Sequence, residues 1–542
     1  MLIAPSVDER EKAKFEELHR SIRACDDILS SVETNLTSFR NDLATVSADI
    51  ETLQARSTTL NIRLENRKAV EKCLGPLVED LSISPVVVSK IAEGHIDDTW
   101  AKALSELDKR SVAYKKSADQ TESKAQADLG PLLEKLILKV CTAHPLAWNR
   151  GKQATNTRTK AVERIRDFLV AQIKALRSPN INAQIIQQQN FLRFKDLYSF
   201  LHKHHAVLAE EICLAYMHTM RWYYANQFGR YEKSLGKIKL HHIDKSDVLG
   251  HEDTSRKSTV LSASKVAGPP HDAFNLGRRI DFLKAGNQAA ISSYLAEEDQ
   301  STHYLEVPFR NFNLALIDNA SAEYTFLATF FSPSLSFATI GKHFNYIFEP
   351  TFALGQSLTK SLVSETCDGL GLLLCVRLNQ HLAFELQRRL IPAVDGYVNG
   401  TAMLLWPRLQ SVMDAHCDSV RALTAALPSK PASASAARGA SAAPHVVTQR
   451  FGQLLHSFLA LSAEAGDDEP VVTSLRRLRG EVEAFLARQG QASLGADARK
   501  KDRFLYNNYS LVLTIISDVG GKLAAEQQEH FEGLKAAFQE AA

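Results

Sequence analysis

The sequence is poor in cysteine and has no surplus of charge of either sign. Seven cysteines stand at positions 25, 73, 141, 213, 367, 375 and 417, and no two form a CxxC pair. A disulfide scaffold or a zinc ribbon needs tightly paired spacing, so we predict reduced thiols in a cytosolic protein. Sixty-four Lys and Arg against 62 Asp and Glu leave a formal charge of +2. That balance argues against nucleic acid as the main partner.

Long hydrophobic runs are also missing. Residues 1–15 lack the basic start and apolar core of a signal peptide. The longest apolar stretches, such as 369–376, stop far short of the ~20 residues that cross a bilayer. We therefore expect membrane contact to be peripheral and indirect. The apolar fraction of 45% in 542 residues is nevertheless ample for several folded domains.

An apolar seam runs through the N-terminal region. Steps of alternating three and four residues lead from Phe15 to Leu64, and only Ser57 among these positions is clearly polar. A 3.5-residue period held over seven heptads predicts a coiled-coil helix about 75 Å long that binds another helix. Charges of both signs flank the seam, as suits selection of a partner. Besides Cys25, the candidate partner-binding residues are Phe15, Leu18, Ile22, Leu29, Val32, Leu36, Phe39, Leu43, Val46, Ile50, Leu53, Leu60 and Leu64.

The rest of the chain also has helical periodicity. Val162, Ile165, Leu169, Ile173 and Leu176 follow a 3.6-residue period, which predicts a helix packed on a bundle. Aromatic side chains are dense over 191–239, where we expect them to line a core rather than a ligand cage. Alternating apolar and polar runs are almost absent, so little β-structure is expected. The predicted class is all-α, a long N-terminal coiled-coil helix followed by an elongated rod of helical bundles.

Composition shifts divide the chain into six predicted regions. The heptads fade after Leu64, and Gly75-Pro76 is expected to interrupt the helix. The regions are an N-terminal coiled-coil assembly region (1–116), an aromatic-rich helical bundle (130–243), a disordered insert (244–272), a second bundle (273–427), a low-complexity linker (428–445) and a C-terminal helical segment (446–542).

Motifs for catalysis or cofactor binding do not emerge. A phosphate-binding loop would need closely spaced glycines before Lys-Ser or Lys-Thr, and Gly341-Lys342 has no such context. The best metal candidate is His202, His204 and His205, but neither an HExxH carboxylate nor a cysteine pair accompanies it. Histidines on a helix surface are the simpler interpretation. We expect a protein without catalytic residues, metal or cofactor. A metal-dependent enzyme that uses these three histidines is kept as an alternative hypothesis.

Several blocks, in order along the chain, carry a resemblance to a known family. The segment 191–238 resembles the signature region of the Vps fifty-two family, with 197–201, Tyr216 and 231–238 among its matches. Further similar blocks are 66–110, 308–331, 404–421, 444–451, 481–485 and 507–509. The resemblance covers most of 15–520. Family members are expected to continue well beyond the 507–509 block, whereas this chain ends soon after it.

The resemblance implies a non-enzymatic subunit of the Golgi-associated retrograde protein (GARP) tethering complex or of its endosomal relative. Such a subunit joins its sister subunits through N-terminal helices. The complex tethers endosome-derived carriers at the trans-Golgi network and engages a Golgi Rab GTPase and SNARE proteins. The expected location is the cytosolic face of the trans-Golgi network and endosomes. The alternative is a self-associating coiled coil, such as a cytoskeletal linker, which needs no other partner.

Overall fold

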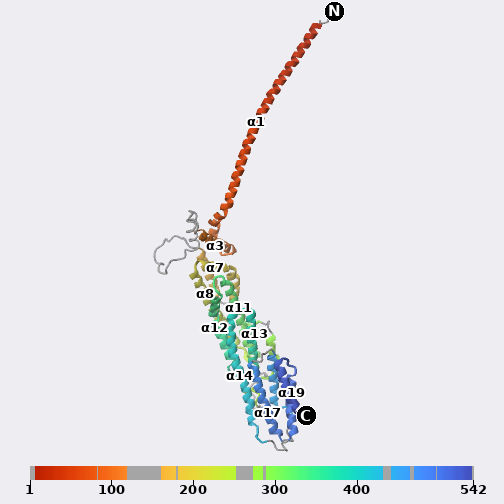
Figure 1. Cartoon of the computed structure of the whole chain (residues 1–542). Helices are drawn as coiled ribbons and strands as arrows, with labels where there is room; N and C mark the ends of the chain where they lie inside the picture. Colours follow the sequence, from red (N-terminus) through yellow and green to blue (C-terminus); the bar gives the residue numbers. More distant parts are fainter. Residues whose placement is uncertain are drawn as a thin grey trace, which may run out of the picture. The chain divides into compact units, whose positions relative to one another are not determined.

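The structure is a computed structural model that describes residues 7–81, 83–118, 160–178, 181–251, 273–284, 289–430, 441–463, 469–495 and 497–539. The chain forms two units, 1–158 and 159–542, and both are built from helices (Figure 1). The described residues contain only two strands, of two residues each, which confirms the predicted all-α class. No helix within the described ranges is both long and apolar enough to span a bilayer.

Unit 1 begins with α1 (Val7–Leu81), a single helix of 75 residues. At 1.5 Å per residue it is about 110 Å long. The helix continues through Gly75 and Pro76, so the predicted interruption there is wrong. A proline inside a helix removes one hydrogen bond, here to the carbonyl of Lys72. Lys72 is exposed, so water can satisfy that carbonyl.

Two shorter helices complete the described part of unit 1. Helix α2 (Pro85–Glu93) precedes α3 (Asp98–Ala118). Ile91, Trp100 and Leu107 are fully buried and form a small core. Asp97 starts α3, because its Oδ1 accepts hydrogen bonds from the Trp100 amide and the Thr99 hydroxyl, both at 2.7 Å. The Thr99 hydrogen bond is the main cause of the lowered pKa of Asp97.

Unit 2 begins with an aromatic-rich helical core. Its elements are α5 (Lys160–Ala175), α6 (Ala183–Ile186), the π-helical turn η2 (Gln187–Phe191), the 3-10 turn η3 (Leu192–Phe194), α7 (Lys195–His204), α8 (Ala206–Leu235), α11 (Glu306–Phe331) and α12 (Phe337–Val363). The five residues of the stripe predicted over 162–176 are all buried. Phe191 packs edge-on against Phe330, and Tyr224 stacks on Phe348. The aromatic segment therefore lines a core, as predicted, except for the exposed Trp222.

A buried carboxylate lies inside this aromatic core. Glu323 of α11 has no exposed surface and accepts hydrogen bonds from Tyr216 (2.7 Å), Tyr224 (2.9 Å) and Gln187 (2.7 Å). Burial raises the pKa of Glu323, and the three donors oppose that shift. The donors come from η2 and α8, so the network joins these elements to α11.

Short elements lie between α8 and α11 in the sequence. They are β1 (Lys239–Leu240), η5 (Gly277–Ile280), α9 (Asp281–Lys284), α10 (Ser293–Glu298) and β2 (Thr302–His303), and β1 pairs with β2 in parallel. Of the insert predicted over 244–272, only 244–251 is described. Within it the Leu249 side chain is buried, and the Leu249 amide donates to His416 Nδ1 at 3.3 Å. The remainder of that prediction lies outside the described residues.

The C-terminal helices share one large hydrophobic core. They are α13 (Gly369–Arg388), the 3-10 turn η6 (Pro392–Val394), α14 (Asp395–Ala426), α16 (Val446–Leu461), α17 (Pro470–Leu494), α18 (Ala498–Ile516) and α19 (Lys522–Ala537). Within unit 2, α7 and α8 lie toward one end and α17 and α19 toward the other (Figure 1). Residues 431–440 of the predicted linker lie outside the described residues, and the predicted helical regions from 159 onward belong to one unit.

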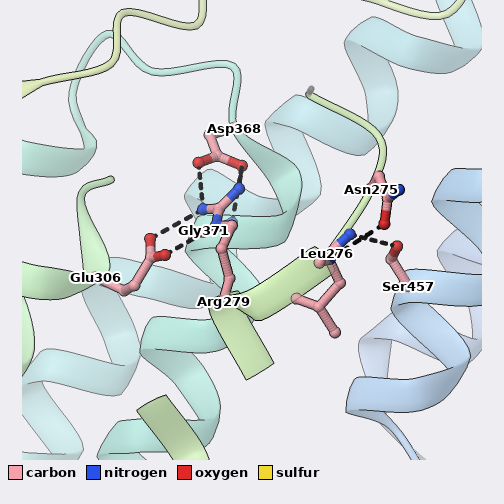
Figure 2. Close-up of polar contacts among 8 residues, drawn as sticks. Asn275, Leu276, Arg279, Glu306, Asp368, Gly371 and Ser457 are labelled. Carbon is pink, nitrogen blue, oxygen red and sulfur yellow. Dashed lines mark hydrogen bonds and ion pairs between the residues drawn. The ribbon is translucent and has the colours of Figure 1, made fainter. Parts of the chain in front are cut away.

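A buried ion cluster attaches the segment that begins at residue 273 to this core (Figure 2). Arg279 lies between Glu306, with Nε–Oε1 at 2.8 Å, and Asp368, with Nη2–Oδ2 at 2.6 Å. All three side chains are at most 6% exposed. Asp368 also accepts the Gly371 amide at 2.8 Å, which caps α13. One guanidinium therefore bridges two buried carboxylates and joins three elements.

Candidate partner-binding site on the first helix

The predicted seam lies on α1 and is open to solvent along its length. The thirteen apolar side chains from Phe15 to Leu64 range in exposure from 44% at Val32 to 71% at Phe15. Residues three and four apart share one face of a helix, so these side chains form a continuous stripe. Soluble monomers rarely expose large contiguous apolar patches. The stripe is therefore a candidate surface for binding a partner helix.

A shallow hollow lies along part of the seam. Between Asp26 and Arg40, the side chains of Leu29, Val32 and Leu36 help to frame an open hollow of ≈ 630 Å³. In a coiled coil, each seam side chain inserts among four residues of the facing helix. The hollow covers several such positions, so it is a stretch of open seam and not a single hole.

Several polar groups of α1 need nothing from a partner. The hydroxyl of Thr34 donates to the Ser30 carbonyl at 2.7 Å, and that of Thr45 to the Asn41 carbonyl at 2.8 Å. A hydroxyl that bonds within its own helix contributes little to the choice of a neighbour. Partner selection therefore falls mainly to the charged residues beside the seam.

Those charges do not complement a second copy of α1 in parallel register. In heptad notation the a positions of the seam are Phe15 and every seventh residue after it, such as Ile22 and Leu29. In a parallel coiled coil, the residue just before each a position on one helix faces the residue five places later on the other helix. The facing pairs would be Lys14 with His19, Ser21 with Asp26, Ile28 with Glu33, Asn35 with Arg40, Asp42 with Ser47, Asp49 with Gln54, Arg56 with Asn61 and Arg63 with Lys68. No pair joins opposite charges, and the last joins two cations. A parallel, in-register pair of identical helices would therefore gain no attraction from these flanking charges.

The exposed apolar surface extends beyond the predicted seam. Val70 and Leu74 are 54% and 51% exposed, and Ile28 and Ile62 are also exposed. Leu74 keeps the heptad register of Leu60, with Arg67 between them. The sequence prediction missed this extension because it stopped at the first charged seam position. The register itself could have revealed it.

The histidine candidates take separate local roles. The His204 ring packs on Phe200 with centroids 4.3 Å apart, and His205 Nδ1 accepts the Leu208 amide at 3.1 Å at the start of α8. His202 lies beside Tyr198. In the part of the chain that the structure describes, no three His, Cys, Asp or Glu side chains are grouped to hold a metal.

Comparison with known families gives two matches along the chain. A model described as the coiled-coil region of the Vps52/Sac2 family matches residues 8–143 and 152–201, which include the whole exposed seam. A model described as the C-terminal region of Vps52 matches 218–542. The chain belongs to the Vps52 family. The exposed seam thus lies in the part of the family that is itself described as coiled coil.

Individual relatives are similar to this chain over nearly its whole length. Vacuolar protein sorting-associated protein 52 A of Arabidopsis thaliana is 30% identical over 97% of this chain and 68% of its own length. The Schizosaccharomyces pombe protein 52 is 31% identical over 94% of both chains. The Homo sapiens homolog is 27% identical over 98% of this chain and 69% of its own length. About a third of the Arabidopsis and human proteins lies outside the match, in line with the expectation for family members. The fission-yeast protein differs, because almost all of its length is matched.

Proposed function

We propose that this chain is a non-enzymatic subunit of a heteromeric vesicle-tethering complex, the Golgi-associated retrograde protein complex or its endosomal relative. It assembles with sister subunits through the seam of α1 and acts in retrograde transport from endosomes to the trans-Golgi network. The exposed seam carries the proposal, because thirteen apolar side chains on a single helix need a partner helix to leave water. The relatives' names, as vacuolar protein sorting proteins, support a role in sorting.

In this proposal the subunit works by geometry rather than by chemistry. The complex lies on the cytosolic face of the trans-Golgi network and endosomes as a peripheral assembly. A Golgi Rab GTPase and SNARE proteins provide its membrane contacts. Weak contacts at separate points of one assembly raise the effective concentration of two membranes near each other. Tight binding at any single contact is then unnecessary.

A heteromeric partner is favoured over a second copy of the chain. The self-associating linker would need α1 to pair with itself, and the parallel in-register pair contains no attractive flanking charges. We therefore expect the purified full chain to be monomeric at micromolar concentration in light scattering. A stable homodimer that dissociates on mutation of the seam would instead support the linker.

The direct test replaces three consecutive a positions of the seam. The triple variant Leu36→Glu, Leu43→Glu and Ile50→Glu places three carboxylates on the stripe. We expect recovery of sister subunits in a tagged pull-down to fall by about a hundredfold, since burying an unpaired charge costs several kcal/mol. Unit 2 should retain its unfolding transition, because these residues are exposed and belong to unit 1.

A matched control uses the opposite face of the same helix. Thr34→Glu, Asn41→Glu and Ala48→Glu have the same seven-residue spacing and add the same charge away from the seam. Partner recovery should stay within about twofold of the wild type. Equal recovery with both triple variants would exclude the seam as the assembly surface.

A further inference from the structure

A groove in unit 2 follows one face of α8 and is separate from the seam. Its volume is ≈ 1220 Å³. Trp222, Asn226, Arg230, Lys233 and Lys237 lie along it at helical spacing. Residues from the segment before α6, from α10 and from α11 complete its lining. Several separate elements of unit 2 thus contribute to one hollow.

The groove is strongly basic. Among the described residues, four cations line it, Arg177, Arg230, Lys233 and Lys237, against one carboxylate, Glu297. Glu297 is already engaged, since it lies 3.2 Å from Lys237 Nζ and accepts the Ser234 hydroxyl at 2.9 Å. Two of the other basic groups contact neutral partners. Arg177 donates to the Thr219 hydroxyl at 3.2 Å, and Arg230 donates to Gln227 at 3.0 Å.

No carboxylate among the described residues pairs with Arg230 or Lys233. Both side chains are exposed, and they are neighbours on one face of α8 because they lie three residues apart. A ligand that brings carboxylates to this pair would gain charge-assisted hydrogen bonds, which are the stronger kind. The charge of the groove therefore selects an acidic ligand.

The remaining lining favours a peptide over a phosphate group. Gln184, Asn226 and Asn319 contribute amide side chains, which both donate and accept hydrogen bonds. A peptide backbone presents both kinds of group, whereas a phosphate accepts only. Trp222 is 54% exposed in the same groove. An exposed indole offers a flat apolar surface to an aromatic or aliphatic side chain.

The length of the groove limits the length of the ligand. Trp222 lies thirteen residues before Leu235, the last residue of α8, which is about 20 Å along the helix axis, and Lys237 lies in the turn that follows. An extended chain spans about 3.3–3.6 Å per residue, so about six residues fit the helical part of the groove. We propose that the groove binds an extended acidic segment of a partner protein, with carboxylates at Arg230 and Lys233 and an apolar side chain on Trp222.

The test uses a defined probe and the full chain. The probe is a fluorescein-labelled seven-residue peptide with six Asp or Glu residues and a Phe at one end, made with the Phe at either end and titrated by fluorescence anisotropy in about 0.1 M salt. The double variant Arg230→Glu and Lys233→Glu is expected to weaken binding at least about tenfold, since the change replaces attraction by repulsion. Trp222→Ala should weaken binding about threefold, and the effect should disappear for a peptide with Ala in place of Phe.

The matched control makes the same charge change elsewhere in unit 2. Lys342→Glu and Lys360→Glu lie on α12, are exposed and do not line the groove. Binding by this variant should remain within about twofold of the wild type, as expected for distant screened charges. The exchange Arg230→Lys with Lys233→Arg keeps the charge and should keep most of the affinity. Circular dichroism of each variant checks that its helices are intact.

Three outcomes would overturn the proposal. The first is an equal loss with the groove and control variants, which would indicate a general charge effect. The second is undetectable binding of the acidic peptide to the wild type. The third is binding of phosphatidylserine vesicles that depends on Arg230 and Lys233 when the peptide does not bind, which would make the groove a membrane contact. None of these measurements depends on the seam of α1.

Discussion

Helices α1 and α5 each carry an apolar stripe, but the two stripes have opposite environments. From Phe15 to Leu64, every apolar seam residue of α1 is at least 44% exposed. From Val162 to Leu176, every stripe residue of the α5 region is at most 3% exposed. The stripes differ in length, since the seam of α1 continues for seven heptads and the stripe of the α5 region ends after fifteen residues.

The length of the stripe separates the two roles. A 3.5-residue period held over seven heptads gives a seam that suits one long partner helix. A stripe of about four turns suits neighbours of similar length in a bundle. Helix α5 meets such neighbours within unit 2, where α7 and α8 pack against it. Equivalent substitutions in the two units should therefore affect different properties, namely assembly for α1 and stability for unit 2.

The largest effect on stability should come from removing a buried cation. Arg279→Met leaves Glu306 and Asp368 buried without their counter-charge. We expect a loss of about 3–5 kcal/mol in the unfolding free energy of unit 2. Urea unfolding followed by tryptophan emission, to which Trp406 of α14 contributes, measures it. Arg56→Met on exposed α1 serves as the comparison and should change the unfolding free energy of unit 2 by less than about 0.5 kcal/mol.

Truncating one leucine on each stripe tests the comparison most directly. Leu169→Ala removes a side chain that is 1% exposed and should cost about 3 kcal/mol in the same urea experiment. Leu43→Ala removes one that is 53% exposed and should leave the unfolding of unit 2 unchanged. In the pull-down, Leu43→Ala should lower the recovery of sister subunits more than Leu169→Ala does. Similar destabilisation by both substitutions would contradict the separation of roles.

Acid should weaken unit 2 through a buried histidine. Burial lowers the pKa of His416 to about 4, against about 6.5 for a free histidine. Between these values the unfolded chain binds a proton that the folded chain does not, so stability falls as pH falls. From pH 7.5 to 5.0 the expected loss is about 2 kcal/mol. His416→Gln should flatten this dependence in urea titrations, whereas His19→Gln on exposed α1 should not.

The smallest expected effect concerns the charges beside the seam. Asp42→Lys with Asp49→Lys should change the affinity for the sister subunit by about 0.5–1 kcal/mol per site, because flanking pairs are solvent-exposed. Titration at two salt concentrations should show the effect shrinking as salt rises. Asp27→Lys with Glu51→Lys reverses two charges at positions that face away from the seam and should have little effect. A larger change for this second pair would contradict the assigned register.

Periodicity alone was sufficient to predict the seam, its helix and the buried stripe of α5. These features repeat over short distances, so neighbouring residues carry the whole signal. The break expected at Gly75-Pro76 shows the limit of local signals. A long exposed helix can lose one hydrogen bond to water and continue.

The polar interior and the groove could not be predicted in the same way. Arg279, Glu306 and Asp368 come together from three elements that are distant in the sequence. The groove likewise combines α8 with Arg177 and Glu297. A single arginine or glutamate has no periodic neighbours to reveal its partner. Such sites depend on how the helices pack, which no short window of sequence contains.

The exposure of α1 also has a consequence for protein abundance. A chain without its partner presents more than a dozen apolar side chains to the solvent, which promotes association with chaperones or with other exposed surfaces. Binding of a partner removes the free species by mass action. In the proposed assembly, the supply of sister subunits therefore sets how much of this protein persists. The same exposed seam makes each surplus copy vulnerable to clearance.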